Sequence, residues 1–212
     1  MKKMKRIIQL TTLFVAVAVV ALSCASPKTK KTVENLKTAI TGETNANVKY
    51  EAFSAKAAEE GYYNIAKMFA AAAAAEAIHI RKHNAVLVLM GEEPFIPSIK
   101  APEVNSTVVN LQAAIEGETY EFTVMYPEFI ETATTEECID ALESFALASE
   151  AEATHALLYG EALNILNETG SDETVASVWY ICPRCGDLFN TIEGLDNCPI
   201  CGANSTSFKI FD

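Results

Sequence analysis

Two glutamate–histidine pairs in this chain have the spacing that places a carboxylate and an imidazole on one face of a helix. The pairs are Glu76 with His79 and Glu152 with His155, each in the pattern Glu-x-x-His. A Gly-Glu-Thr triplet precedes each pair, and its glutamate, Glu43 or Glu118, stands 33 or 34 residues before the glutamate of the pair. The chain therefore repeats one set of side chains that can bind metal, with a period of about 75 residues.

The repeated set predicts two metal ions bridged by carboxylates. In di-iron four-helix bundles, two helices each supply one glutamate and the other two each supply a Glu-x-x-His pair. Carboxylate oxygens can bridge two irons, and imidazole is a suitable ligand for the ferrous ion. Two such short matches arise by chance roughly a few times in a hundred, and the repeated triplets reduce that further. His83, one turn after His79, is expected at the end of the bundle or against a ligand rather than on the metal.

The second copy of the repeat carries one more carboxylate than the first. Glu121 follows Glu118 by three residues, whereas Ala46 stands at the same place after Glu43. We expect Glu121 to be a metal ligand that exchanges during redox chemistry, because a spare carboxylate on one metal suits turnover better than static storage. A solvated surface glutamate is the alternative.

Tyrosines occupy similar places after the two Gly-Glu pairs. Tyr50 and Tyr126 are expected either to donate hydrogen bonds to ligand carboxylates or to be buried aromatic residues. With Glu121 they are the candidate catalytic residues.

Four of the six cysteines form two Cys-x-x-Cys-Gly motifs near the C-terminus. They are Cys182, Cys185, Cys198 and Cys201, with 12 residues between the two motifs. This spacing predicts one tetrahedral thiolate site for a metal ion. Five aromatic residues are expected to shield it: Trp179, Tyr180, Phe189, Phe208 and Phe211. The motifs allow iron or zinc, and we favour iron because a di-iron enzyme needs an electron source.

Hydrophobic periodicity predicts an all-α bundle of four long helices over residues 33–170. Two helices are expected over 33–61 and 62–90, followed by a proline-rich crossover. A third helix is expected from Ser106 to about Thr132, kinked or divided by Pro127, and a fourth from Thr134 to about Thr169. A separate small domain containing the cysteines is expected over residues 178–212.

Residues 1–23 have the composition of an export signal. Basic residues precede an apolar run, and Ala21-Leu22-Ser23-Cys24 resembles the lipobox of bacterial lipoproteins. We expect lipidation of Cys24, a tether over 24–32, and a lipid-anchored protein at the periplasmic face or the outer membrane. Ordinary cleavage to a soluble periplasmic protein and an uncleaved anchor are the alternatives. The formal net charge of −12 over 212 residues argues against nucleic acid as a partner.

The combined motifs resemble those of rubrerythrin over roughly residues 33–211. They are Gly42-Glu43, Glu76-x-x-His79, Gly117-Glu118-x-x-Glu121, Met125-Tyr126-Pro127, Glu152-x-x-His155 and the two cysteine motifs. The resemblance implies a ferritin-like di-iron bundle followed by a rubredoxin-like Fe(Cys)4 domain. It also implies seven ligands for the two irons: Glu43, Glu76, His79, Glu118, Glu121, Glu152 and His155. In the family one iron exchanges a carboxylate for a histidine on reduction, and here that pair would be Glu121 and His79.

The resemblance further implies reduction of hydrogen peroxide to water. Electrons in the family pass from reduced pyridine nucleotide through carrier proteins, and the rubredoxin-like domain of one subunit lies near the di-iron site of the other in a homodimer. Most family members are cytoplasmic, so the export signal is a departure. It favours a membrane-linked or periplasmic electron carrier as the donor.

Three functional hypotheses follow. The first is a peroxidase that protects against oxidative stress, with electron transport through the cysteine-bound iron. The second is an iron-storage protein of the ferritin type, and the third is a structural module with zinc in the cysteine site and no turnover. The additional domain and Glu121 favour the peroxidase.

Overall fold

The computed structural model describes residues 29–212. The predicted signal peptide, residues 1–23, and the predicted lipidation site Cys24 lie outside the described residues. The predicted tether ends earlier than expected, because residues 30–32 already belong to the first helix. Within residues 29–212, no helix combines the length and the apolar character that a membrane span requires.

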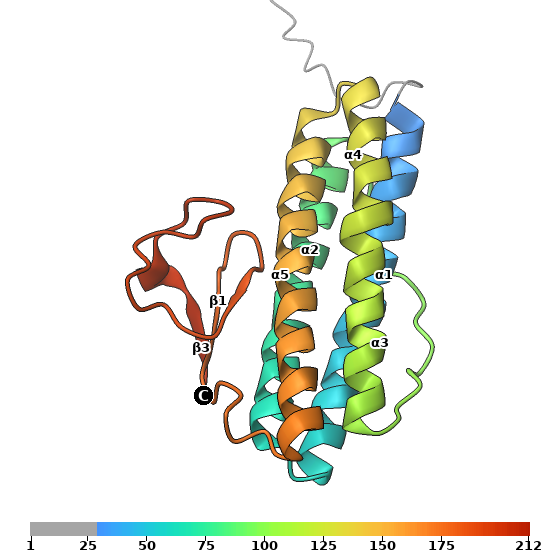
Figure 1. Cartoon of the computed structure of the whole chain (residues 1–212). Coiled ribbons are helices and arrows are strands. Elements are labelled where there is room, and N and C mark those ends of the chain that lie inside the picture. The colour runs from blue at the N-terminus through green and yellow to red at the C-terminus, as the bar shows by residue number, and fades with distance from the viewer. Residues whose placement is uncertain (1–28) are drawn as a thin grey trace, which may run out of the picture.

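The predicted four-helix bundle is confirmed (Figure 1). Its helices are α1 (Lys30–Glu59), α2 (Tyr63–Leu89), α3 (Thr107–Tyr120), α4 (Tyr126–Thr135) and α5 (Ile139–Thr169), with a π-helix, η2 (Glu121–Met125), between α3 and α4. α1 and α2 form one hairpin, while α3, η2 and α4 form one continuous rod beside α5. Buried alanines of α2, among them Ala71, Ala72 and Ala75, let the neighbouring helices approach closely.

The rod formed by α3, η2 and α4 corresponds to the predicted third helix, but it is not interrupted where Pro127 was expected to divide it. This proline lies in the first turn of α4, a position that proline tolerates. The α-helix is interrupted instead by the π-helical turn Glu121–Met125, an irregularity that is frequent at functional sites. The fourth helix also begins later than predicted, at Ile139, because Thr134 and Thr135 still belong to α4.

The crossover between α2 and α3 is held against the bundle near its start. Asn84 on α2 accepts a hydrogen bond from the backbone nitrogen of Phe95 at 2.6 Å and donates one to the Phe95 carbonyl at 3.2 Å. Lys37 on α1 forms an ion pair with Glu92 at 2.9 Å. These contacts hold Phe95 at a cavity on the surface of α1.

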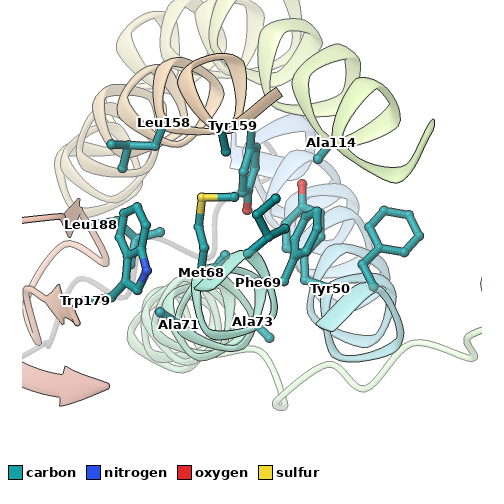
Figure 2. Packing of buried hydrophobic residues seen from close by; sticks show 14 of the residues in the cluster. Tyr50, Met68, Phe69, Ala71, Ala73, Ala114, Leu158, Tyr159, Trp179 and Leu188 are labelled. Carbon is teal, nitrogen blue, oxygen red and sulfur yellow. The ribbon is translucent and has the colours of Figure 1, made fainter. Parts of the chain in front are cut away.

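A small antiparallel sheet follows the bundle. Its strands are β1 (Trp179–Ile181), β2 (Leu188–Phe189) and β3 (Lys209–Phe211), in the order β2-β1-β3, with a 3-10 helix, η3 (Ser205–Ser207), before β3. The sheet packs on the bundle instead of standing apart. Trp179 and Leu188 belong to the same buried apolar cluster as Met68 on α2 and Leu158 on α5 (Figure 2).

The predicted aromatic shield is only partly correct. Tyr180, Phe189 and Phe208 pack around the cysteines. Trp179 and Phe211 pack against the apolar cluster of the bundle instead. They therefore attach the segment that contains the four cysteines (the cysteine segment) to the helices, because burying a large aromatic side chain is strongly favourable.

The segment between α5 and β1 is tied to the start of α2 by Asp172. Its Oδ2 atom accepts hydrogen bonds from the backbone nitrogens of Asn64 at 2.7 Å and Ile65 at 3.1 Å. These N–H groups lie in the first turn of the helix, where they have no partner within the helix. Asn64 Nδ2 in turn donates to the carbonyls of Asp172 and Val175, at 3.0 and 3.1 Å.

Replacing Asp172 by alanine is expected to lower the free energy of unfolding by about 1–2 kcal/mol, because a buried helix cap is lost. In a chain of this size the melting temperature should fall by about 2–4 °C for each kcal/mol. Thermal unfolding followed by circular dichroism measures the change. The exposed neighbour Glu173 provides the control, and an equal loss in Glu173→Ala would contradict the capping role.

Candidate metal centres

The carboxylates and histidines of the repeat meet at the centre of the bundle. α1 supplies Glu43, α2 supplies Glu76 and His79, α3 supplies Glu118, and α5 supplies Glu152 and His155. Each of these side chains has an exposed fraction of 1% or less. Burying six ionisable groups away from water costs free energy unless the groups are paired with each other or bind metal.

These side chains form two overlapping groups that could each hold a metal ion. The first contains Glu43, Glu76, His79 and Glu152, and the second contains Glu76, Glu118, Glu152 and His155. Within each group the ligand atoms lie within 4.8 Å of one another. Glu76 and Glu152 belong to both groups, so they are placed to bridge two adjacent ions.

Both histidines turn Nδ1 toward the carboxylates. His79 Nδ1 lies 2.8 Å from Glu152 Oε1 and 3.0 Å from Glu76 Oε2. His155 Nδ1 lies 2.8 Å from Glu152 Oε2 and 3.5 Å from Glu76 Oε1. Since Nδ1 is the nitrogen nearest the carboxylates in both rings, it is the nitrogen available to a metal.

The opposite nitrogens of the two rings contact the cysteine segment. His79 Nε2 lies 2.7 Å from the carbonyl oxygen of Cys185, and His155 Nε2 lies 3.2 Å from that of Gly186. A carbonyl only accepts, so each Nε2 carries a proton, and in the neutral ring Nδ1 has a lone pair directed at the cluster. Carbonyl partners of this kind orient metal-binding histidines and fix their tautomer.

The charges of the cluster are poorly compensated by protein groups alone. Burial raises the pKa of Glu43 and of Glu118 well above the usual value. Burial opposes the charge of His155 as well, but the neighbouring Glu152 raises the pKa of this histidine to about 10. Two divalent cations would remove this conflict, because they favour ionised carboxylates and neutral imidazoles.

Unpaired atoms test whether metal ions fit this cluster. Among the described residues, eleven buried side-chain nitrogen and oxygen atoms make no hydrogen bond of acceptable geometry. Six of them belong to the cluster, where the contacts of 2.8 Å between Glu152 and the two histidines are short but poorly aligned. The six are Glu43 Oε2, Glu76 Oε1, Glu118 Oε2, both carboxylate oxygens of Glu152, and His155 Nδ1. Buried polar atoms of native proteins normally have partners, so the unpaired atoms mark where metal ions fit.

Glu121 lies beside the cluster but in neither group of four. It is half-buried at the start of η2 and lines a cavity of about 610 Å³ together with Gly42, Met125 and Phe95. A Cβ atom on Gly42 would lie 3.3 Å from Glu121 Oε1, so the glycine leaves room for this carboxylate. Burial, then the charge of Glu118, raises the pKa of Glu121 well above its usual value. Glu121 thus stands between the cavity and the metal cluster.

Both candidate tyrosines contact carboxylates of the cluster. The Tyr50 hydroxyl donates to Glu118 Oε1, and the Tyr126 hydroxyl donates to Glu43 Oε1. Both rings are fully buried, and burial raises the pKa of each phenol well above its usual value. The two tyrosines therefore remain protonated hydrogen-bond donors. His83 is buried next to Tyr126, outside both ligand groups, as expected.

Lys49 is a charged neighbour of the cluster that the sequence did not single out. Its ammonium lowers the pKa of Glu118 and of Glu121, although burial outweighs it at both. A Cβ atom on Gly117 would lie 3.3 Å from Lys49 Nζ, so this glycine provides space for the lysine. The only signal in the sequence is the position of Lys49 next to Tyr50.

The four cysteines form the predicted second centre. Their sulfurs lie within 4.8 Å of one another, with Cys182 Sγ 3.4 Å from Cys201 Sγ and Cys185 Sγ 3.5 Å from Cys198 Sγ. A hydrogen bond from Cys185 lowers the pKa of Cys182 to about 5, while burial raises that of Cys198 to about 12. Four convergent sulfurs are the donor set of a tetrahedral iron or zinc ion.

Gly186 allows the cysteine segment to pack closely against the bundle. Its φ angle is +84°, and a Cβ atom there would lie 2.4 Å from His79 Nε2 and 3.3 Å from the Ala75 carbonyl. Gly186 is the last residue of the first Cys-x-x-Cys-Gly motif, but the motif does not predict its contact with His79. The family resemblance implied proximity between subunits, whereas here the segment meets the cluster of its own chain.

Comparisons with known proteins identify the family of this chain. A family model described as Rubrerythrin matches residues 34–163, which contain all six residues of the central cluster. Nigerythrin of Nitratidesulfovibrio vulgaris is 39% identical over 180 residues, covering 85% of this chain and 86% of that protein. Rubrerythrin-2 of Clostridium acetobutylicum is 37% identical over 190 residues, covering 88% of this chain and 100% of that protein.

Solved structures also include similar proteins. A structure described as the partially reduced state of nigerythrin matches with a TM-score of 0.76, 39% identity, and coverage of 85% of this chain and 86% of that one. The Desulfovibrio desulfuricans bacterioferritin matches with a TM-score of 0.64 at 17% identity, covering 71% of this chain and 92% of that one, which supports the ferritin-like fold alone. This chain therefore belongs to the rubrerythrin family, with a di-iron site in its bundle and a site of four cysteines that fits an iron ion.

Proposed function

We propose that this chain is a peroxidase that reduces hydrogen peroxide to two molecules of water. The observation that carries this proposal is the pair of hydrogen bonds from His79 and His155 to the carbonyls of Cys185 and Gly186. They connect an electron-carrying iron centre directly to the di-iron cluster. An iron-storage protein has no need of such a connection, whereas a reductase must restore its irons after every turnover.

The ligands we assign to the two irons are Glu43, Glu76, His79, Glu118, Glu152 and His155, with Glu121 as the exchangeable seventh. When bound, the two irons supply two electrons and act as Lewis acids toward the peroxide oxygens. Glu76 and Glu152, which belong to both groups, would bind both ions, and the tyrosine hydroxyls keep Glu118 and Glu43 in position. In the structure His79 belongs to one of the two groups, and Glu121 lies outside both.

The cavity beside Glu121 is the proposed entrance for peroxide. Its volume of about 610 Å³ is ample for a molecule of two oxygens, and it reaches the surface between α1 and η2. Glu121 is the carboxylate at its inner side, and burial favours the protonated form of this group. Glu121 can therefore hold a proton near the oxygen that departs as water.

The electron donor is proposed to be a carrier protein outside the cytoplasm. This part of the proposal comes from the export signal and from Cys24, which would anchor the chain to a membrane by lipid. Soluble pyridine nucleotide does not reach that compartment, so a membrane-linked or periplasmic carrier would reduce the cysteine-bound iron. A homodimer is part of the same proposal.

Stopped-flow mixing of the fully reduced protein tests the function. Oxidation of the di-iron site should be much faster with hydrogen peroxide than with the same concentration of dioxygen. Equal rates with the two oxidants would refute the peroxidase. Uptake of many irons per chain together with cage assembly would instead support the ferritin-type alternative.

A further inference from the structure

The cavity beside Glu121 is much larger than hydrogen peroxide requires. Its volume is about 610 Å³, whereas a water molecule takes about 30 Å³ of the liquid and hydrogen peroxide has only one oxygen more. Pockets that bind small organic molecules have volumes of about 300–1,000 Å³. The cavity therefore has the size of a site for an organic molecule, and the residues that line it indicate which kind.

Four side chains give the cavity an apolar wall: Phe95, Tyr120, Met125 and Phe129. Met125 on η2 and Phe129 on α4 are almost completely buried, so the bundle core fixes them in place. Phe95 comes from the crossover, where two hydrogen bonds to Asn84 hold its backbone. An apolar group that binds against this wall leaves water, which is favourable.

The charged side chains at the cavity do not favour an anion. Lys37 lines the cavity, but its ammonium already lies 2.9 Å from the carboxylate of Glu92. Glu128, which also lines the cavity, is exposed and adds a negative charge. The hydroxyl of Thr41 donates to the Lys37 carbonyl of its own helix at 2.8 Å. The cavity therefore suits a neutral molecule better than a carboxylate such as a fatty acid.

The polar end of a bound molecule would lie at Glu121. This carboxylate lines the cavity, and a Cβ atom on Gly42 would lie 3.3 Å from its Oε1, so the glycine leaves this end open. Gly42 directly precedes Glu43, and Glu121 follows Glu118 by three residues. The residues around this end are thus next to two proposed iron ligands. A molecule with its apolar group on the wall can direct its polar group toward the cluster.

We propose that this chain also reduces neutral organic hydroperoxides, which bind with the organic group on the apolar wall and the hydroperoxide group at Glu121. This inference rests on the proposed peroxidase function and adds a second class of substrate for the same site. The O–O bond breaks, the oxygen on carbon remains as an alcohol, and the other oxygen leaves as water. Two electrons from the reduced irons of the bundle and two protons from water in the open cavity complete the balance.

Cumene hydroperoxide, a neutral hydroperoxide with a phenyl ring, is the test substrate for the iron-loaded, full-length chain. In stopped-flow mixing it should oxidise the reduced di-iron site much faster than the same concentration of dioxygen does. Thr41→Trp fills part of the cavity from α1. The ratio of the rate with cumene hydroperoxide to the rate with hydrogen peroxide should then fall by about tenfold or more, as for discrimination by pocket shape. Thr134→Trp, at an exposed position of α4 outside the cavity, is the matched control and should leave this ratio unchanged.

A measurement independent of activity uses the zinc-loaded protein with methionines labelled with ¹³C at the methyl group. The probe is 2-phenyl-2-propanol, the alcohol that cumene hydroperoxide would give. Its ring should shift the methyl signal of Met125 and leave those of Met68 and Met90, which are buried outside this cavity. Met125→Leu identifies the signal. Thr41→Trp should abolish the shift, and a Met125 signal that does not move in the wild-type protein would overturn the binding site.

The outcomes separate this inference from the peroxidase function. If hydrogen peroxide oxidises the di-iron site faster than dioxygen but cumene hydroperoxide does not, the second substrate class is refuted and the peroxidase stands. If neither peroxide is faster than dioxygen, both reactions fail, and the NMR measurement still decides whether the cavity binds the organic group.

A second variant keeps the inference testable if Thr41→Trp does not fold. Phe95→Ala removes part of the apolar wall on the crossover and should lower the same ratio of rates. A ratio unchanged from the wild-type value in the folded variants would refute binding in this cavity.

Discussion

Replacing Glu152 by alanine is expected to empty both iron positions of the bundle at once. Glu152 belongs to both groups of four ligands, and its two oxygens lie 2.8 Å from the two histidines, one from each. Its loss removes one ligand from each ion and the bridge between them. Peroxide reduction should fall by more than about 100-fold, since even partners that only orient a metal ligand cost 10–100-fold.

Metal analysis and visible spectra distinguish this result from unfolding. Glu152→Ala should keep the iron of the cysteine site and lose the two of the bundle. Glu43→Ala and Glu118→Ala each remove a ligand from one group alone, so they should retain more iron than Glu152→Ala. Glu150→Ala, an exposed glutamate on the same helix, is the matched control. Full di-iron occupancy in Glu152→Ala would contradict the ligand assignment.

Replacing Gly186 by alanine should disconnect the two iron centres without removing either metal. The new methyl group would lie 2.4 Å from His79 Nε2, so the cysteine segment must move away from the bundle. This movement breaks the hydrogen bond between His79 and the Cys185 carbonyl. We expect re-reduction of the di-iron site to slow by about tenfold to 100-fold, the cost that a displacement of about 1 Å can have.

Gly202 provides the matched control for this variant. It occupies the corresponding position in the second cysteine motif, with φ of +72°, and a Cβ atom there meets no described atom within 4 Å. Alanine at either position bears a similar backbone strain. The contacts with His79 and with the Ala75 carbonyl are present at Gly186 and absent at Gly202. Equal rates of electron transfer in Gly186→Ala and Gly202→Ala would therefore exclude the proposed connection.

The ligands of both centres could be predicted because each is marked by a short pattern of neighbouring residues in the sequence. A spacing of three residues fixes which side chains share a helix face, so Glu76 with His79 and Glu152 with His155 could be paired without a structure. The cysteine motifs are similarly self-contained. Helix ends were less predictable. The turn between α4 and α5, for example, depends on how these helices pack against each other.

The features that the sequence did not predict are contacts between distant segments. His83 was expected only near a ligand, and its link to Ser144 crosses 61 residues of sequence. The contact between Gly186 and His79 depends on how Trp179 packs on the bundle. The π-helical turn at Glu121 has no marker of its own, since its residues suit an ordinary helix. Such features arise from tertiary packing, which local patterns do not encode.

The most direct measurement follows both iron centres of the wild-type chain during reaction with excess peroxide. The fully reduced protein is mixed with peroxide, and the absorbance of each centre is recorded over time. Our account predicts that the di-iron site is oxidised first and that the cysteine-bound iron then loses its electron to it. A cysteine-bound iron that stays reduced while the bundle irons are repeatedly oxidised, or that is oxidised before them, would contradict the account.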